Sequence, residues 1–427
     1  MVEYRPVPDE LIDEFRGIVQ YAFAPAETPE SYERVEDLPG PARVGARRGL
    51  FASAGNAETA AGETGESDAG GDLRCVCAHH WFTVALRGDD HPLVGLSAVA
   101  TPPEHRRQGL VERLLVESLR EYRERDQHLS ALWPFEYGFY RRYGWARAGS
   151  YVRYNCPPEA LAFAAEPTDG RGTFRELASD EYDELNRVLD AHNEGYALGM
   201  RRTEEWWQYR VFEGWDRDPA VYGWEQNGEL RGYVVSLIEE GEGETELIAR
   251  DLAFVDREAY LQLLRFLSYH DSQVERVRFR GFPERNPLLF DLAEDPRAIE
   301  CELRPGAMVR IVDVPAALEA LSYPPDAKGR LTIAVSDSLA DWNDGTFAVE
   351  VADGVATCRQ IGGRGAGSGD DSPDVTIDVD TLSQLYVGHS PVERAVRAGE
   401  LSAGTDAVRE LLGAMFPPQD VFLREEF

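Results

Sequence analysis

Residues 97–149 constrain the fold of this chain more than any other stretch. A strand runs into Pro102 and Pro103, which end it because proline cannot donate a ladder hydrogen bond. The sequence R-R-Q-G follows, and residues 110–125 then repeat apolar side chains with the period of a helix that buries one face. Free N–H groups and the dipole at such a helix N-terminus favour a phosphate, so the stretch predicts an anion site. Taken alone, the turn also fits an ordinary α/β unit with a basic surface turn.

A second motif follows and narrows the interpretation. A short apolar strand at residues 128–133 precedes the aromatic segment F-E-Y-G-F-Y-R-R-Y-G-W at residues 135–145. Together with A-V-A-T-P-P-E-H-R-R-Q-G-L at residues 98–110, this segment resembles the GNAT superfamily of N-acetyltransferases. Many members of that superfamily have Gly or Ala where this chain has Val111. The Eis (enhanced intracellular survival) branch also lacks that small residue, and it is the branch that this chain resembles.

The resemblance implies an α+β / α/β fold built from three domains. Residues 1–155 would form a catalytic GNAT domain, residues 156–307 a degenerate second GNAT-like domain, and residues 308–427 a sterol-carrier-like α+β domain. In both GNAT-like domains a mixed central sheet would be flanked by helices. Residues 54–72 are mostly Ala, Gly, Glu, Ser and Thr without a large apolar side chain, so we expect a flexible insertion there.

The later domains carry weaker signals. In the second domain the order of strand, turn and helix recurs, but Asp256 and Glu258 stand near the place of the glycine turn. Acidic side chains would repel a pyrophosphate, so we expect no coenzyme binding there, as an unrelated α/β domain would also predict. D-W-N-D-G-T-F and L-S-Q-L-Y resemble the sterol-carrier-like domain. The glycines of residues 361–372 are not followed by Lys-Ser or Lys-Thr, which favours a hairpin tip over a phosphate loop.

The resemblance also implies acetyl-CoA as the cosubstrate. The coenzyme would lie along Val99, Ala100 and Thr101, and Phe135 and Glu136 would flank its pantetheine arm. The residues that would hold its pyrophosphate are Arg106, Arg107, Gln108, Gly109, Leu110, Val111 and Glu112.

Two residues are implied as the catalytic acid and base. Tyr140 would be the general acid, because a phenol with an ordinary pKa of about 10 can protonate a leaving thiolate. The α-carboxylate of Phe427 would be the general base, and an apolar residue after R-E-E suits a buried, placed end better than a solvated tail. The alternatives are core packing for Tyr140 and a fraying end at Phe427.

The acceptor side of the site is less constrained. We expect the acceptor pocket to include Trp81, Trp133 and Glu426, since aromatic walls and carboxylates suit a cationic amine. The reaction would acetylate a primary amine of a small cationic acceptor, such as an aminoglycoside, a polyamine or a lysine side chain. The rival hypothesis is a non-catalytic binding or scaffold protein with relic GNAT domains and a lipid-binding C-terminal domain.

The charge of the chain favours a protein adapted to high salt over a protein that binds nucleic acid. The formal net charge is −33, with 77 acidic and 44 basic residues, and Lys328 is the only lysine. A surface of this kind stays soluble in concentrated salt, which favours a halophilic cytoplasm. It lacks the basic footprint that nucleic-acid binding requires.

The remaining signals concern location, metals and assembly. We expect a cytoplasmic protein, because the sequence shows neither a signal peptide nor an apolar run of the ~18 residues that would span a membrane. Five cysteines fit no disulfide framework. Cys75 and Cys77 precede His79 and His80, but without a second ligand pair we expect buried strand residues rather than a metal site. The Eis branch implies a homo-oligomer, namely a hexamer.

Overall fold

The computed structural model describes residues 2–27, 30–52, 72–165, 171–241, 243–283, 288–363 and 372–427. The expected flexible insertion at residues 54–72 lies outside these residues except for Asp72. The expected hairpin tip at residues 361–372 is described only at its ends, where residues 361–363 belong to a strand.

A mixed sheet forms the first domain. Its strands lie in the order β1 (Val2–Pro6), β2 (Ala46–Ala52), β3 (Leu73–Leu86), β4 (Asp89–Ala100), β5 (Leu129–Leu132), β16 (Met308–Ile311) and β6 (Ala146–Arg147), and β10 (Met200–Arg201) also pairs with β3. Its helices are α1 (Ile12–Phe23), α2 (Gly40–Arg43), α3 (Leu110–Glu124) and α4 (Tyr137–Arg141). Strands β4 and β5 are parallel, joined by the crossover that contains α3.

The second domain repeats this plan with a sheet of seven strands. The order is β15 (Glu300–Pro305), β7 (Ser150–Cys156), β14 (Arg276–Pro283), β13 (Thr245–Phe254), β12 (Glu229–Glu240), β11 (Ala220–Gln226) and β8 (Thr173–Glu176). The helices are α5 (Tyr182–Asn193), α6 (Glu204–Trp206), α7 (Arg257–Ser268) and α8 (Leu288–Leu292). A π-helical segment, η7 (Trp207–Phe212), continues α6.

The third domain is a five-stranded sheet covered by helices. Its strands lie in the order β19 (Val355–Gly363), β18 (Gly345–Ala352), β17 (Gly329–Ser336), β20 (Val375–Asp378) and β21 (Leu401–Ala403). The helices are α9 (Val314–Ala320), α10 (Val379–Tyr386), α11 (Val392–Ala398) and α12 (Asp406–Met415). Short 3-10 turns elsewhere in the chain lie at Asp9–Leu11, Val35–Asp37, Pro103–His105, Pro158–Ala164, Ser179–Glu181 and Pro296–Ala298.

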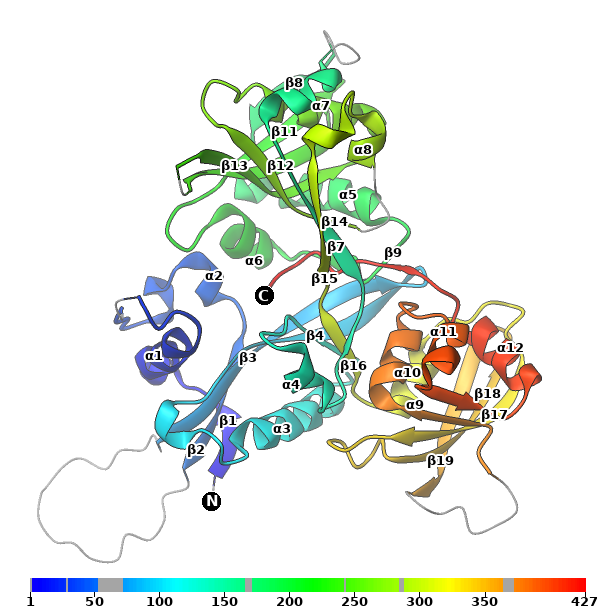
Figure 1. Ribbon diagram of the computed structural model, residues 1–427. Helices are drawn as coiled ribbons and strands as arrows, with labels where there is room; N and C mark the ends of the chain where they lie inside the picture. The colour runs from blue at the N-terminus through cyan, green and yellow to red at the C-terminus, as the bar shows by residue number, and fades with distance from the viewer. Residues whose placement is uncertain are drawn as a thin grey trace, which may run out of the picture.

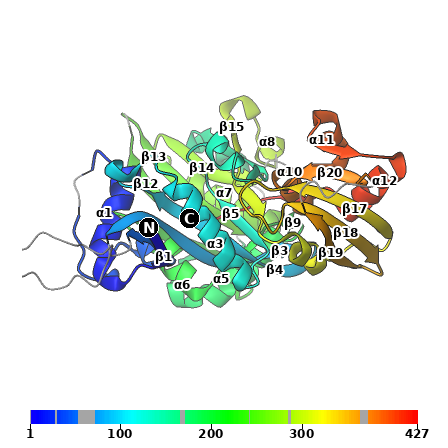
Figure 2. The same cartoon turned by 90° about the horizontal axis from the view of Figure 1, so that it is seen from below.

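The three domains appear as three lobes around a common centre in Figure 1, and the view from below separates the third domain at one end (Figure 2). Strands cross between the first two lobes. β7, expected in the first domain, pairs with β14 and β15 in the second sheet. β16, expected to open the third domain, lies between β5 and β6 in the first sheet. The first two sheets are therefore tied together by the chain at both ends of the second domain.

The C-terminal segment returns from the third domain to this centre, where Figure 1 marks the end of the chain. β22 (Asp420–Val421) pairs in parallel with β9 (Tyr196–Ala197), and Phe422 N donates to Ala197 O at 2.9 Å. The tail thus reaches the junction of the first and second domains as ordered backbone.

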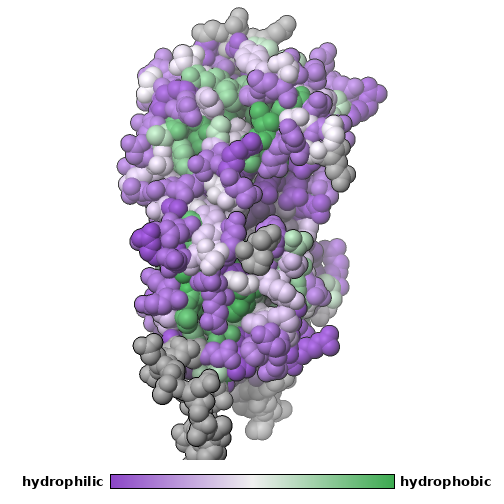
Figure 3. Space-filling view, turned by 90° about the vertical axis from the view of Figure 1, so that its left-hand side faces the viewer, coloured by the Kyte–Doolittle hydropathy of each residue, from purple (hydrophilic) through white to green (hydrophobic). Residues whose placement is uncertain are grey.

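Hydrophilic side chains cover most of the face on the side of α1 (Figure 3), as the composition leads one to expect. None of the helices in the described ranges is both long and apolar enough to cross a membrane.

Candidate active site

The ladder between β4 and β5 ends before β4 does. It runs from Leu93 opposite Leu129 to Gly95 opposite Ala131, and β4 continues to Ala100 without β5 beside it. Ala98, with φ of 52°, lies in this continuation. The sheet therefore opens beside residues 96–100, and the backbone that faces the opening is available to an extended ligand. Val99 and Ala100 belong to this segment of β4, and the Thr101 hydroxyl after it donates to the Cys75 sulfur at 3.2 Å.

The predicted glycine turn and helix follow this opening. Arg107 and Gly109 have φ of 60° and 75°, a left-handed conformation that costs glycine nothing. The first helical hydrogen bond runs from Arg113 N to Gly109 O at 3.1 Å. Among the described residues, nothing accepts from the N–H groups of residues 107–112, and no side chain caps α3. A run of free N–H groups at the positive end of a 15-residue helix can hold a phosphate.

Two side chains brace the turn. Arg106 Nε donates to Thr101 O at 3.1 Å, and Gln108 Nε2 donates to Glu104 O at 3.2 Å. Arg107 is exposed, and none of the described acidic groups lies within salt-bridge distance of it, so its guanidinium is free for a phosphate. Leu110 and Val111 instead pack partly into the core beneath α3, and Glu112 is exposed in the first turn.

The corresponding helix of the second domain is closed to an anion by its own cap. The Asp256 carboxylate accepts from Ala259 N at 2.9 Å at the start of α7 and pairs with Arg231. A carboxylate thus occupies the place that a phosphate would take. This cap would oppose the binding of a pyrophosphate at the start of α7.

Tyr140 lies in α4 inside an aromatic cluster. Its ring centroid is 5.1 Å from that of Phe139, 5.6 Å from Phe135 and 6.3 Å from Trp145. The side chain is 4% exposed, and its hydroxyl has no hydrogen-bond partner among the described residues. Burial, with smaller contributions from Cys77 and Cys75, raises the pKa of Tyr140 well above its ordinary value. The phenol is consequently a protonated donor that nothing nearby uses.

Phe135 and Glu136 border this cluster. Phe135 is 63% exposed, which is unusual for a large aromatic side chain and leaves its ring available to a ligand. Glu136 is exposed immediately before α4 and makes no capping hydrogen bond there.

Phe427 lies on β3 and β4 at the end of the β4–β5 ladder. Its ring centroid is 5.1 Å from Phe82 and 5.6 Å from His80, and a Cβ at Gly95 would meet the ring at 2.7 Å. The same Cβ would meet the Phe82 ring at 2.6 Å, so Gly95 is required there by the close approach of both Phe82 and Phe427 rather than by backbone conformation. His80 is buried and shares a hydrogen bond of 2.8 Å with the Ser97 hydroxyl; burial lowers its pKa to about 3, so it is neutral.

Tyr140 and Phe427 approach the opening from opposite faces of the first sheet. Tyr140 belongs to the core cluster on the α3 side of the sheet, which also contains Val94 and Leu96. Phe427 packs with Phe82 and Leu93 on the other side. Strand alternation puts these two sets of side chains on different faces. The structure therefore brings one predicted catalytic residue to each side of the place where β4 and β5 separate.

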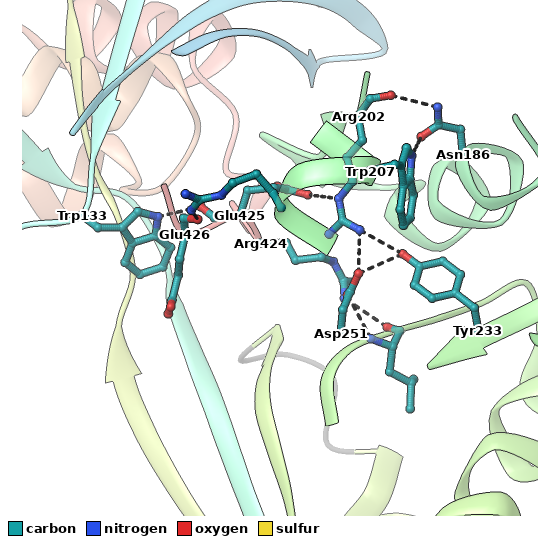
Figure 4. A network of polar contacts seen from close by, with 11 residues as sticks. Trp133, Asn186, Arg202, Trp207, Tyr233, Asp251, Arg424, Glu425 and Glu426 are labelled. Carbon is teal, nitrogen blue, oxygen red and sulfur yellow. Dashed lines mark hydrogen bonds and ion pairs between the residues drawn. The ribbon is translucent and has the colours of Figure 1, made fainter. Parts of the chain in front are cut away.

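A buried ionic network holds the tail in place at Arg424 and Glu425, just before the end of the chain (Figure 4). Arg202 donates to Asp251 at 2.6 Å and to Glu425 at 3.0 Å, and Arg424 donates to Asp251 at 2.8 Å. Burial opposes ionisation of Asp251, but the guanidinium groups of Arg202 and Arg424 outweigh it and hold its pKa below the ordinary value. Trp133 Nε1 donates to the Glu425 carbonyl at 2.7 Å, which ties the tail to the end of β5.

A cavity of about 1100 Å³ opens next to the tail, between the first and second domains. Trp133 and Glu426 line it, as expected of an acceptor pocket, together with Trp206 and Arg210. Trp81 does not line it. Strand alternation turns Trp81 to the α3 face, where it packs 6.1 Å from Tyr122 and beneath the Arg125 guanidinium at 4.7 Å. The structure thus separates Trp81 from the other two residues expected in the acceptor pocket.

The cysteine and histidine side chains of this group pack on both faces of β3. His79 shares a hydrogen bond of 3.1 Å with the Ser118 hydroxyl and lies 3.4 Å from the Cys77 sulfur, whereas His80 faces the other side of β3. No set of three or more candidate metal ligands occurs in the part of the chain that the structure describes.

Arg202, Arg210 and Asp251 were not among the residues that the sequence singled out. They come from three separate segments of the second domain and meet the tail only in the folded chain. The arginine pair at residues 201–202 is the only local signal, and an arginine pair is common on any surface.

Three family models match successive parts of the chain. Residues 3–148 match an acetyltransferase (GNAT) domain, residues 198–311 match a second model described as an acetyltransferase (GNAT) domain, and residues 314–424 match a sterol carrier protein domain. The predicted fold of two GNAT domains followed by a sterol-carrier-like domain is confirmed.

Proteins that are similar over most of the chain are also described as N-acetyltransferases or as a probable N-acyltransferase. An uncharacterized N-acetyltransferase of Streptomyces griseus is 27% identical over 358 residues, which cover 78% of this chain and 82% of the relative. The N-acetyltransferase Eis of Mycobacterium tuberculosis is 26% identical over 335 residues, 76% of this chain and 78% of the relative. A crystal structure of a probable N-acyltransferase from Enterococcus faecalis V583 has the same fold, with a TM-score of 0.80 at 22% identity over 100% of both chains.

Proposed function

We propose that the first domain catalyses acetyl transfer from acetyl-CoA to a primary amine. The chain is an acetyltransferase built of two GNAT domains and a sterol carrier protein domain. The coenzyme supplies a thioester carbonyl to be attacked. Residues 107–112 would hold its pyrophosphate through their free N–H groups, and residues 99–101 and Phe135 would border its pantetheine arm. The observation that carries the proposal is the placement of Tyr140 and Phe427 on opposite sides of the β4–β5 opening.

The two residues then divide the proton transfers. The α-carboxylate of Phe427 accepts a proton from the attacking amine, so the nitrogen can form a bond to the acyl carbon. When the carbon–sulfur bond breaks, the Tyr140 hydroxyl donates its proton to the departing thiolate. The raised pKa of Tyr140 keeps that proton in place until the thiolate is formed. The Phe427 ring, held against Gly95 and Phe82, orients the carboxylate.

The proposal also covers the cellular environment and the oligomeric state of the enzyme. We infer a protein that works in a salt-rich cytoplasm, which its net charge of −33 supports. We also infer assembly into a homo-oligomer, as a hexamer, which rests on the resemblance to the Eis branch.

Extension of the chain beyond Phe427 tests the role of the carboxylate. A five-residue extension is expected to lower kcat at least about 10²-fold, because the carboxylate becomes a neutral amide. Acetyl-CoA binding, measured by calorimetry, is expected to be unchanged, since the N–H groups of residues 107–112, rather than the tail, would hold the pyrophosphate. The matched control is the same extension before Val2, at the outer edge of the first sheet. Full turnover by the C-terminally extended protein would remove Phe427 from the mechanism.

A further inference from the structure

The cavity beside the tail has a charge opposite to that of the whole molecule. The chain carries 77 acidic and 44 basic residues, yet arginines outnumber carboxylates among the side chains that line this cavity. Arginine at a cavity wall is costly unless an anion compensates it. The question is therefore which of these arginines already have a carboxylate.

Part of the positive charge is already compensated inside the protein. Arg202 and Arg424 share Asp251 at 2.6 and 2.8 Å, and Arg278 pairs with Glu246 at 2.7 Å. These three arginines hold the wall together and have little charge left for a ligand.

Besides Arg217, which donates to the Ile238 carbonyl, four other arginines of the wall have no such partner. Among the described residues, no acidic group lies within 4.0 Å of Arg153, Arg210, Arg250 or Arg280. Arg210 donates instead to the carbonyl oxygens of Pro41 and Glu426, and its guanidinium lies 5.1 Å from the Trp206 ring.

Three of the four lie side by side on neighbouring strands. The order β7-β14-β13 puts Arg153, Arg280 and Arg250 on adjacent strands of the second sheet. Arg153 Nε donates to the Arg280 carbonyl at 3.3 Å, and the pairing of Ala249 with Phe279 brings Arg250 next to Arg280. This row of three guanidinium groups is called the arginine row below.

The row and Arg210 repel one another electrostatically. Burial, followed by the charge of Arg280, lowers the pKa of Arg250. Burial, followed by the charge of Arg250, lowers the pKa of Arg210 to about 10. Glu239 and Glu426 oppose these shifts without overcoming them. The carboxylates that line the same cavity outside the buried network are exposed side chains, so they do not neutralise its wall.

We propose that the acceptor of this enzyme is an amine that also carries a carboxylate or phosphate group, and that the arginine row binds that anionic group. Guanidinium groups bind carboxylates and phosphates through paired N–H donors. An aminoglycoside or a polyamine has no anionic group to accept these hydrogen bonds. The amine then lies toward Trp133 and Glu426, at the end of the cavity that the tail forms. This inference rests on the proposed acetyl transfer and replaces the polycationic acceptor classes expected from the sequence.

Matched pairs of amines test the proposal in a free-thiol release assay with the full chain. Lysine differs from 1,5-diaminopentane by a carboxylate, and O-phosphoethanolamine differs from ethanolamine by a phosphate. We expect kcat/KM to be about 10- to 100-fold higher for the anionic member of at least one pair, as for hydrogen bonds to charged groups. The two pairs distinguish a carboxylate from a phosphate. Equal or higher kcat/KM for both non-anionic members overturns the proposal.

Variants locate the effect in the arginine row. Arg250→Gln and Arg280→Gln are expected to lower the anionic-to-neutral ratio of kcat/KM about tenfold while the KM for acetyl-CoA stays constant. Arg276→Gln is the control, because Arg276 lies on β14 outside the cavity and pairs with Glu300 at 2.8 Å. Because each ratio is taken within one protein, a loss of stability affects both members equally. An unchanged ratio in both cavity variants contradicts the proposal.

A separate binding measurement keeps this inference apart from the acetyl-transfer proposal. If no amine releases thiol, acetyl transfer fails, and calorimetry with O-phosphoethanolamine and ethanolamine still tests the anion site. Tighter binding of the phosphorylated amine that Arg250→Gln abolishes supports the arginine row. Equal affinity of the two amines refutes it.

Discussion

At the scale of single residues, Tyr140 illustrates how burial prepares a side chain for chemistry. Its ring is enclosed by Phe135, Phe139 and Trp145, and its hydroxyl has no partner among the described residues. The Tyr140 oxygen is not among the fully enclosed polar atoms that lack a partner, so the hydroxyl can reach a ligand, a role that a packed phenylalanine would not fill.

Tyr140→Phe is therefore expected to lower kcat by about 10²- to 10⁴-fold with little change in acetyl-CoA affinity. Tyr143→Phe, in the same aromatic cluster, is the control and should retain activity. Steady-state kinetics and calorimetry measure the two effects.

The pH profile gives a second readout for the same residue. Because the pKa of Tyr140 is raised, its hydroxyl stays protonated above the ordinary phenol value of about 10. Loss of the acid should not limit kcat up to that pH. A fall in kcat with an apparent pKa near 8 or 9 would exclude Tyr140 as the acid.

At the scale of elements, the two equivalent helices differ in what satisfies their N-termini. α3 leaves the N–H groups of residues 107–112 free, whereas the Asp256 carboxylate caps α7. The same position in the fold is thus left open in one domain and filled by a carboxylate in the other.

Substitutions at the two helices should separate these roles. Arg107→Ala is expected to raise the KM for acetyl-CoA several-fold without a change in unfolding free energy, since Arg107 is exposed. Asp256→Ala is expected to cost about 1 kcal/mol of stability, as for other lost caps, without a change in that KM. Kinetics and urea unfolding check both outcomes. An unchanged KM in Arg107→Ala would mean that the turn is only structural.

Local sequence was sufficient for the parts of the site that are contiguous in the chain. The turn at residues 106–109, α3 and the segment around Tyr140 could be predicted because turn residues and helical periodicity act over short distances. The structure places Trp81 on the face of β3 away from the cavity, and the sequence did not reveal this because both faces of β3 are apolar. The arginine row could not be predicted, since its members meet only through the pairing of three strands.

At the scale of the whole molecule, the dominant property is charge. A net charge of −33 on 427 residues causes electrostatic repulsion within the protein, and this repulsion destabilises the folded state. Salt screens exposed charges, with a Debye length of about 10 Å at 0.1 M and about 3 Å at 1 M.

The midpoint of thermal unfolding is consequently expected to rise by several degrees between 0.1 M and 2 M KCl. Choline chloride should have a similar effect if screening is the cause, because it is also a monovalent salt. Scanning calorimetry in both salts provides the measurement. A midpoint that is constant or falls with KCl would contradict adaptation to salt.

The position of β16 has a consequence for the time at which the first domain can form. β16 lies between β5 and β6 near one edge of the sheet, so β5 has no partner on that side until Met308–Ile311 has left the ribosome. These residues are made more than 170 positions after Leu132, the end of β5. At about 5–20 residues per second, the nascent first domain waits roughly 10–35 s with an unpaired strand edge. Chaperone dependence during synthesis should follow from this delay rather than from the stability of the finished protein.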